Sequence, residues 1–213
     1  MTDATAFAEM QQAFDAAAGW FEQTVDAIDT RADEWHVSAL GEWTVRDLVG
    51  HTSRALLTVE QYLGPGPSTS NASTSDYYRA VRESRSDPEA VAERGRQSAA
   101  DLGDDAAGAV REVSARVRLL IAHQPADARV VTPVGEWRLA AYLPTRVFEL
   151  AVHTADLLRA TGLEDGRGAP PTVNRVALRV LSGLLAEASD DDAGMLLASL
   201  TGRGSLSPGF SLL

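Results

Sequence analysis

The chain has 213 residues, of which 45% are hydrophobic and 23% are charged, as in a globular protein that folds in water. Nineteen basic against thirty acidic residues give a formal net charge of −11, which argues against nucleic acid or an anionic membrane surface as a partner. The sequence contains no cysteine, which excludes disulfide bonds, a protein thiolate nucleophile and cysteine-bound zinc.

The N-terminal segment MTDATAFAEMQQAF lacks the basic and apolar regions of a signal peptide. No apolar run in the chain approaches the length of a membrane span. We therefore expect a cytoplasmic protein.

Amphipathic periodicity predicts the first helix over about residues 4–29. Its apolar stripe repeats at steps of three and four residues and consists of Phe7, Met10, Phe14, Ala17, Phe21, Val25 and Ile28. A second helix should begin after Thr44, which forms a capping-box pattern with Asp47, and should end near Leu63. Residues 64–75, GPGPSTSNASTS, hold no large apolar side chain, which predicts a flexible surface loop.

Two or three helices are expected over residues 76–124, one beginning near Pro88 and another spanning about 104–123. The segment ARVVTPVGEWRL, residues 128–139, alternates β-branched and polar side chains on either side of a Pro-Val-Gly turn. This pattern predicts a short hairpin or an extended link.

The segment RVFELAVHTADLLRATG, residues 146–162, predicts a helix that ends at Gly162. Pro144 should lie near the start of this helix, where its missing N–H does little harm. A last helix is expected over about residues 171–187. An acidic turn should follow it, and we expect an irregular tail over residues 190–213.

Four long helices with appendages favour a four-helix bundle. The expected fold class is all-α, with additional short helices and a small extended or hairpin segment. The 64–75 loop interrupts a series of helices, so we interpret it as a loop within a single domain over residues 1–213.

Glu149 and His153 are four residues apart and therefore lie on one face of their helix. His51 shares the apolar stripe of the second helix with Leu48 and Ala55, which places it toward the bundle core. Bundle cores commonly build metal sites from carboxylates and histidines on facing helices. Two histidines and one glutamate would leave at least one coordination position open, as in a catalytic site.

Simpler interpretations stay open on spacing alone. Glu149 and His153 can form an ordinary contact between residues four apart on a helix surface. His51 can be a hydrogen-bonded core histidine. Asp156 lies three residues after His153, so it either orients that histidine as a metal ligand or faces solvent.

The other candidate residues carry weaker signals. His36 and His123 are expected at helix ends, where solvent exposure or a contact with the helix dipole explains them. Asp47 is expected to cap a helix, and Arg203 either grips a ligand carboxylate or is solvated. Beyond the metal centre, the catalytic candidates are therefore Asp47, Asp156 and Arg203, and Arg203 is also the candidate for cofactor binding. The sequence shows no P-loop, dinucleotide-binding glycine motif or nucleophile elbow.

Three segments resemble a known family. WTVRDLVGH, residues 43–51, and RVFELAVHTADLLRATG, residues 146–162, are similar to the second helix and the metal-binding helix of the mycothiol-dependent maleylpyruvate isomerase N-terminal family. That family belongs to the DinB-like superfamily. LTGRGSLSPGFS, residues 200–211, is similar to the ending of actinobacterial members.

The resemblance implies a DinB-like four-helix bundle that binds a divalent metal, typically zinc. By motif, the metal ligands are His51, Glu149 and His153. The resemblance also implies that a small-molecule thiol, mycothiol, serves as cosubstrate, and that the metal favours its thiolate form. That thiolate would add to an activated double bond and allow isomerisation, or displace a leaving group in an S-transfer.

The isomerase proper, which this chain resembles over the bundle, continues into a C-terminal sterol-carrier-like domain. Here about two dozen residues follow the last expected helix, so we expect no second domain of that kind. A stand-alone thiol S-transferase is therefore an alternative to an isomerase, with an electrophilic small molecule as the acceptor.

Two other functions stay open at this stage. A metal-assisted hydrolase would need Asp47 or Asp156 as its general base. A non-enzymatic DinB-like binding or stress module would use the metal only for stability. The residues do not choose between zinc, nickel, iron and manganese, and a homodimer is an option because bundle faces often pair.

Overall fold

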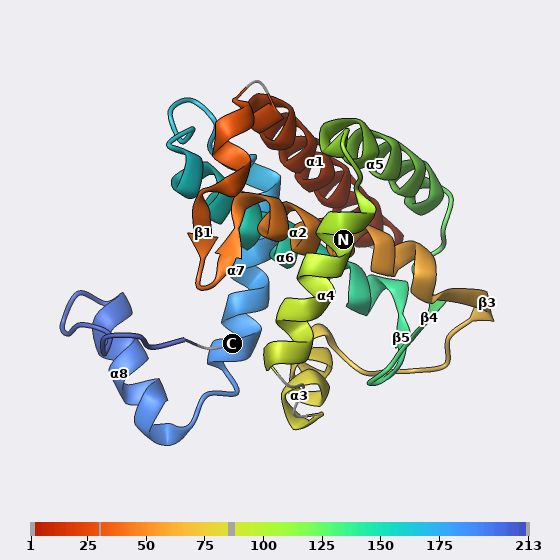
Figure 1. Ribbon diagram of the computed structural model, residues 1–213. Helices are drawn as coiled ribbons and strands as arrows, with labels where there is room; N and C mark the ends of the chain where they lie inside the picture. Colours follow the sequence, from red (N-terminus) through yellow and green to blue (C-terminus); the bar gives the residue numbers. More distant parts are fainter. Residues whose placement is uncertain (1–2, 30, 85–87, 212–213) are drawn as a thin grey trace.

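The computed structural model describes residues 3–29, 31–84 and 88–211, and helices dominate these ranges (Figure 1). The four longest helices are α1 (Asp3–Asp29), α2 (Val45–Tyr62), α5 (Ala106–Ala122) and α6 (Leu139–Thr161). α1 and α2 each pack against both α5 and α6, so the four helices form a bundle. The all-α four-helix bundle expected from the sequence is confirmed.

Shorter helices pack around this bundle. They are the 3₁₀-helix η1 (Ala32–His36) and the α-helices α3 (Thr74–Glu83), α4 (Pro88–Asp101), α7 (Pro171–Leu185) and α8 (Asp190–Leu200). α4 lies along α2, α7 packs on α6 and α1, and α3 contacts both α6 and α7. The helices α3 and α4 therefore enclose the end of the bundle where α2 and α6 meet.

Two small antiparallel sheets complete the fold. β1 (Ser38–Leu40) pairs with β2 (Trp43–Thr44) just before α2. β3 (Leu63–Pro67), β4 (Ala128–Thr132) and β5 (Gly135–Arg138) form a second sheet in the order β3-β4-β5. β4 and β5 form a hairpin, which is one of the two alternatives predicted for this segment.

Local sequence signals explain where the two site-bearing helices begin or end. The Thr44 hydroxyl accepts a hydrogen bond from the Asp47 N–H, and the Asp47 carboxylate accepts one from the Thr44 N–H. This is the predicted capping box at the start of α2. α6 ends at Gly162, whose φ of 64° lies in the left-handed region that glycine adopts without strain.

The apolar stripe of α1 lies in the centre of the core. Phe14, Phe21, Val25 and Ile28 are fully buried there, together with Leu48 of α2 and side chains of α5 and α6. Burying one such side chain contributes about 1.5–3 kcal/mol, so these contacts hold the helix positions on which the site depends. No helix in the described ranges is both long enough and apolar enough to span a membrane.

The expectation of a flexible loop over residues 64–75 is wrong at both ends of this range. Leu63–Pro67 form β3, which pairs with β4, and α3 begins at Thr74, so only residues 68–73 lie outside regular structure. Backbone pairing needs no large apolar side chain, which is why composition alone missed this strand. The Ser68 N–H also donates to the Asp127 carbonyl at 2.7 Å and extends the attachment.

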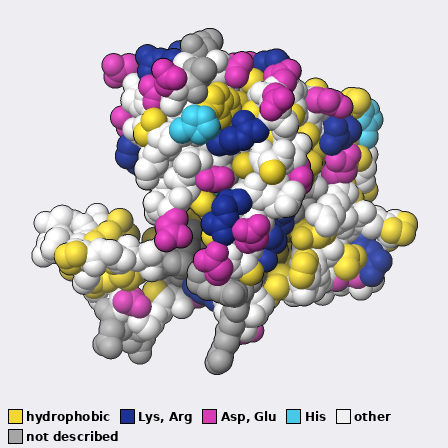
Figure 2. Space-filling model, in the orientation of Figure 1, with side chains coloured by type: hydrophobic (Ala, Val, Ile, Leu, Met, Phe, Trp, Pro, Cys, Tyr) yellow, Lys and Arg dark blue, Asp and Glu magenta, His cyan; other side chains and the backbone are white. Residues whose placement is uncertain are grey.

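The expected irregular tail over residues 190–213 is also wrong in its first half. α8 spans Asp190–Leu200, and the Ser189 hydroxyl caps it by accepting from the Asp192 N–H. A serine followed by acidic residues favours the start of a helix. The acidic segment therefore begins a helix and does not form the expected turn. α8 is set apart from the bundle (Figure 1), and hydrophobic side chains lie at the surface of this segment (Figure 2). Leu197 and Leu200 of α8 are 68% and 70% exposed. Residues 212 and 213 lie outside the described residues.

Pro144 is not near the first turn of its helix, contrary to expectation. α6 begins directly after β5, at Leu139, so Pro144 is an interior residue that denies the Ala140 carbonyl its helical N–H partner. The next carbonyl, that of Ala141, accepts a hydrogen bond from the Thr74 hydroxyl at 2.9 Å. This bond ties the start of α3 to α6.

The close approach of α4 to α2 depends on Gly50. A Cβ atom at Gly50 would lie 2.3 Å from the backbone nitrogen of Ala99, closer than atoms can pack. We expect Gly50→Ala to lower the free energy of unfolding by about 2 kcal/mol, because helix backbones would have to separate. The control Gly19→Ala, whose Cβ meets only an arginine side chain at 3.9 Å, should not be destabilised. Urea denaturation of both variants measures the difference, and equal stabilities would contradict the prediction.

Candidate metal centre

His51 of α2 meets Glu149 and His153 of α6 where the two helices pack. Each of the three side chains offers one ligand atom, and these atoms all lie within 4.8 Å of one another. The two imidazole rings are edge to face with centroids 4.9 Å apart, and His153 Nε2 lies 3.4 Å from Glu149 Oε2. The structure therefore brings together the three residues that the sequence singled out.

Neighbouring side chains hold Glu149 and His153 in place. His153 Nδ1 lies 3.3 Å from a carboxylate oxygen of Asp156, whose other oxygen accepts from Arg159 at 2.9 Å. The Tyr78 hydroxyl of α3 donates to Glu149 Oε1 at 3.4 Å. A carboxylate on Nδ1 leaves Nε2 of His153 facing the cluster, the arrangement that orients histidine ligands in metal sites.

The His51 ring packs against neighbouring side chains, but one of its nitrogens lacks a hydrogen-bond partner in the described part of the chain. Its ring lies 4.4 Å from that of Trp43, centroid to centroid, and Gly95 of α4 allows this packing because a Cβ there would come within 3.1 Å of the indole. Within the described part of the chain, the buried Nδ1 of His51 has no hydrogen-bond partner. The structure therefore does not show the hydrogen-bonded core histidine that spacing alone left open for His51.

The three groups strongly shift one another's proton affinities. Burial would raise the pKa of Glu149, but the hydrogen bond from His153 and the charge of Arg146 hold it at about 2. Burial likewise opposes protonation of His153, but Asp156 and Glu149 raise its pKa to about 9. Burial and the nearby His153 lower the pKa of His51 to about 4. At pH 7 the metal-free cluster is thus a neutral His51 beside an ion pair.

This donor set fits a divalent metal ion. Two imidazoles and one carboxylate are ligands that zinc and several other divalent metals accept. The unpartnered nitrogen of His51 is a polar atom that packing alone leaves unexplained.

The cluster borders a cavity of about 420 Å³. The cavity lies between α2 and α6, with α3, α4 and the β4–β5 turn contributing to its walls. Its lining comprises His51, Arg54, Ala55, Thr58, Tyr62, Tyr77, Val81, Val91, Arg94, Pro133, Val134, Tyr142, Arg146, Glu149 and His153. A small molecule in this cavity would reach all three residues of the cluster.

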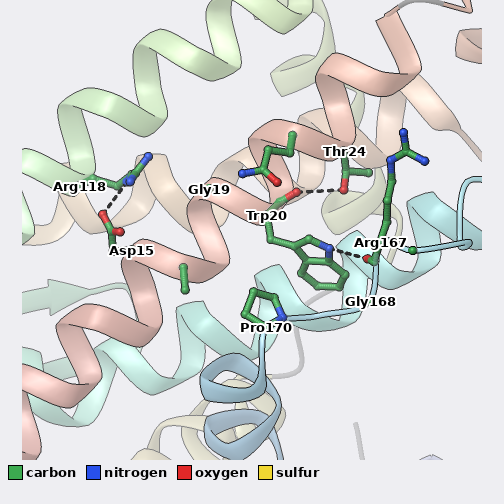
Figure 3. Close-up of a pocket in the computed structure, with 11 residues that line it drawn as sticks. Asp15, Gly19, Trp20, Thr24, Arg118, Arg167, Gly168 and Pro170 are labelled. Atoms are coloured by element: carbon green, nitrogen blue, oxygen red, sulfur yellow. Dashed lines mark hydrogen bonds and ion pairs between the residues drawn. The ribbon is translucent and has the colours of Figure 1, made fainter.

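A second cavity, of about 390 Å³, lies between α1 and the loop before α7 (Figure 3). Its polar groups bond to one another: Arg118 pairs with Asp15 at 2.7 Å, and the Trp20 indole N–H donates to the Arg167 carbonyl at 2.8 Å. None of the residues lining it is a histidine. These contacts attach the loop to the bundle and offer no comparable chemistry.

The remaining sequence candidates lie elsewhere. Asp47 belongs to the α2 capping box, and Arg203 is exposed and donates to the Thr201 carbonyl at 3.0 Å. His36 ends η1 and His123 caps α5, as expected for histidines at helix ends. Asp156 is the one further candidate that touches the cluster.

Three neighbours of the cluster were not predicted from the sequence. Arg146 and Arg54 each lie three residues from a cluster histidine or glutamate on the same helix, so reading the helix faces one turn further would have found them. Tyr78 comes from α3, and no spacing links it to Glu149. Only the tertiary structure brings that hydroxyl to the carboxylate.

The family model described as "Mycothiol maleylpyruvate isomerase N-terminal domain" matches residues 13–158, about two thirds of the chain. The matched segment runs from α1 nearly to the end of α6 and contains His51, Glu149 and His153. Searches of curated proteins and of solved structures found no match.

The raised pKa of His153 makes the stability of the metal-free protein depend on pH. The folded state binds this proton more tightly than an unfolded histidine of pKa 6.5, so the stabilisation is complete below that pH and is lost as the pH rises through about 9. Between about pH 6 and pH 10 we expect the wild type to lose up to about 3 kcal/mol more than His153→Gln.

Urea denaturation in the presence of a chelator measures this difference. His123→Gln is the matched control, because His123 is exposed and lies outside the cluster. Parallel stability curves for the wild type and His153→Gln would show that the ion pair contributes nothing.

Proposed function

The chain belongs to the mycothiol maleylpyruvate isomerase N-terminal domain family, and on this premise we propose that it is a divalent-metal-dependent enzyme that uses mycothiol. The thiol would serve in thiol transfer or in thiol-assisted isomerisation of an electrophilic small molecule. The observation that carries the proposal is the cluster of His51, Glu149 and His153 at the wall of a cavity.

The number of protein ligands favours an enzyme over a structural metal site. Structural zinc sites usually have four protein ligands, whereas catalytic sites have three and leave a position for water or substrate. Among the described residues, the cluster offers three donors and borders a cavity of about 420 Å³, within the range of small-molecule sites. A metal-stabilised binding module would need no such cavity beside its metal.

The sequence contains no cysteine, so a thiol used in the reaction would have to come from a separate molecule. When bound by His51, Glu149 and His153, a divalent ion, with zinc the first candidate, would lower the pKa of a thiol and so supply a thiolate nucleophile at neutral pH. Asp156 would orient His153, and Tyr78 would orient Glu149 through its hydroxyl. Burial and the charge of Glu149 raise the pKa of Tyr78, so it remains a hydrogen-bond donor.

Hydrolysis at the same site has less support. A hydrolase needs a general base near the attacking water. Asp47 is engaged in the α2 capping box, and Asp156 already contacts His153 and Arg159. Neither carboxylate lines the cavity. A thiol needs no such base once its proton is lost to solvent.

The metal assignment is tested by single substitutions. We expect His51→Ala and His153→Ala to lose stoichiometric zinc, and Asp156→Asn to bind zinc about 10–100-fold more weakly because it no longer orients His153. Metal analysis and competition with a chromophoric chelator measure both effects. His123→Ala is the matched control. Zinc affinity equal to that of the wild type in either cluster variant would refute the assignment.

The thiol assignment is tested by isothermal titration of mycothiol into the zinc-loaded and the chelated protein. We expect binding only to the loaded protein, with release of a proton because the thiol binds as a thiolate. Proton release is detected as an observed binding enthalpy that varies with the ionisation enthalpy of the buffer. An analogue carrying a hydroxyl in place of the thiol should bind at least about tenfold more weakly. If fully metallated protein binds no mycothiol, the thiol function is wrong and the metal site still stands.

A further inference from the structure

The two histidines of the cluster are held in place in different ways. Asp156 contacts Nδ1 of His153 at 3.3 Å, so a carboxylate fixes the orientation of that ring. In the described part of the chain, the buried Nδ1 of His51 has no such partner. A histidine that binds a metal needs its ring held in one orientation, so a contact other than a hydrogen bond has to hold His51.

The indole of Trp43 makes that contact with the His51 ring. The two ring centroids are 4.4 Å apart, and the ring planes are inclined by 37°. At this distance the rings touch, so the imidazole cannot turn far without colliding with the indole. The buried Nε1 of Trp43 has no hydrogen-bond partner among the described residues. The indole is therefore held by packing and not by a hydrogen bond.

The position of Trp43 is fixed from two sides. Its backbone belongs to β2, where it pairs with Leu40 of β1, and the next residue, Thr44, caps α2. On the other side the indole meets α4 at Gly95, which is buried. A Cβ atom at Gly95 would lie 3.1 Å and 3.3 Å from two indole carbons and 3.5 Å from Cβ of His51. The glycine therefore lets α4 pack directly against both side chains.

We propose that Trp43 is the positioning residue of His51 as a metal ligand, and that Gly95 of α4 holds the indole against the imidazole. An imidazole that binds a cation becomes positively polarised, and the negative face of an indole attracts such a group. The stacking therefore restricts the ring and also favours its metal-bound form. His153 is held by a charged group and His51 by an aromatic face. The inference rests on the metal site of the proposed function.

Zinc affinity tests this role, measured on the folded full chain by competition with a chromophoric chelator. Trp43→Leu removes the aromatic face and should bind zinc roughly tenfold more weakly than the wild type, as when other groups that orient a ligand are lost. Trp43→Phe keeps an aromatic ring beside His51 and should recover most of the affinity. The control Trp35→Leu removes a buried tryptophan of η1 that lines neither the cluster nor its cavity. It should lower stability and leave zinc affinity unchanged.

Gly95→Ala tests the same contact without changing either ring. Alanine favours a helix more than glycine does, so α4 should be no less helical. The added Cβ would press on the indole, and we expect zinc affinity to fall about threefold to tenfold. Gly19→Ala, whose Cβ meets only an arginine side chain, should bind zinc like the wild type. Gly95→Ala decides the matter if Trp43→Leu does not melt cooperatively.

Failure of this inference can be told apart from failure of the proposed function. If the wild type binds zinc and a folded Trp43→Leu binds it equally well, Trp43 only fills space and the metal site stands. An equal loss of affinity in Trp35→Leu would also overturn the inference, because it would show a general effect of lost packing. Wild-type affinity in Gly95→Ala would overturn the role of α4. If the wild type itself binds no zinc, the metal-dependent function is wrong and the role of Trp43 falls with it.

Discussion

The ion pair between Glu149 and His153, with His51 facing it from α2, is the interaction on which the rest of the site depends. It lies where two core helices pack, so its charges are partly removed from water. Burying a charge is costly unless a partner and hydrogen bonds compensate. The fold has to supply those partners at this position, and most features around the cluster do so.

Different elements around the site hold different residues of the cluster in place. α3 brings the Tyr78 hydroxyl to Glu149, while Asp156 on α6 fixes the ring of His153. α4 comes close to α2 because Gly50 and Gly95 leave room for it, and it covers His51 and Trp43. A cluster held from three sides keeps its donor atoms together without a metal ion, so little reorganisation is needed when one binds.

The cavity beside the cluster has the opposite electrostatic character to the chain as a whole. The formal net charge is −11, yet Arg54, Arg94 and Arg146 all line this cavity. Most of the paired arginines elsewhere are at the surface, where ion pairs contribute little to stability. Burying a cation is costly, and the hydroxyl and tyrosine-ring contacts of Arg146 are what compensate for that cost in the described part of the chain.

Local sequence signals predicted much of the fold. The apolar periodicity of α1, the capping box of Thr44 and Asp47, and the glycine that ends α6 all act within one or two helical turns, so they can be read along the chain. α8 and β3 were not predicted from the sequence, for two different reasons. The cap at Ser189 was interpreted as a turn, and β3 exists because β4 offers its backbone from some sixty residues away.

The site divides in the same way. The sequence by itself determined that Glu149 and His153 share a face, because helix geometry dictates neighbours four residues apart. The apolar stripe of the second helix placed His51 toward the core, and the family motifs then implied that these three residues are metal ligands. Only the tertiary structure decided that Tyr78 meets Glu149 and that Arg146 lies buried beside the same cavity. Such contacts depend on how separate helices pack, and packing is set by the sum of many side-chain volumes, not by any spacing along one helix.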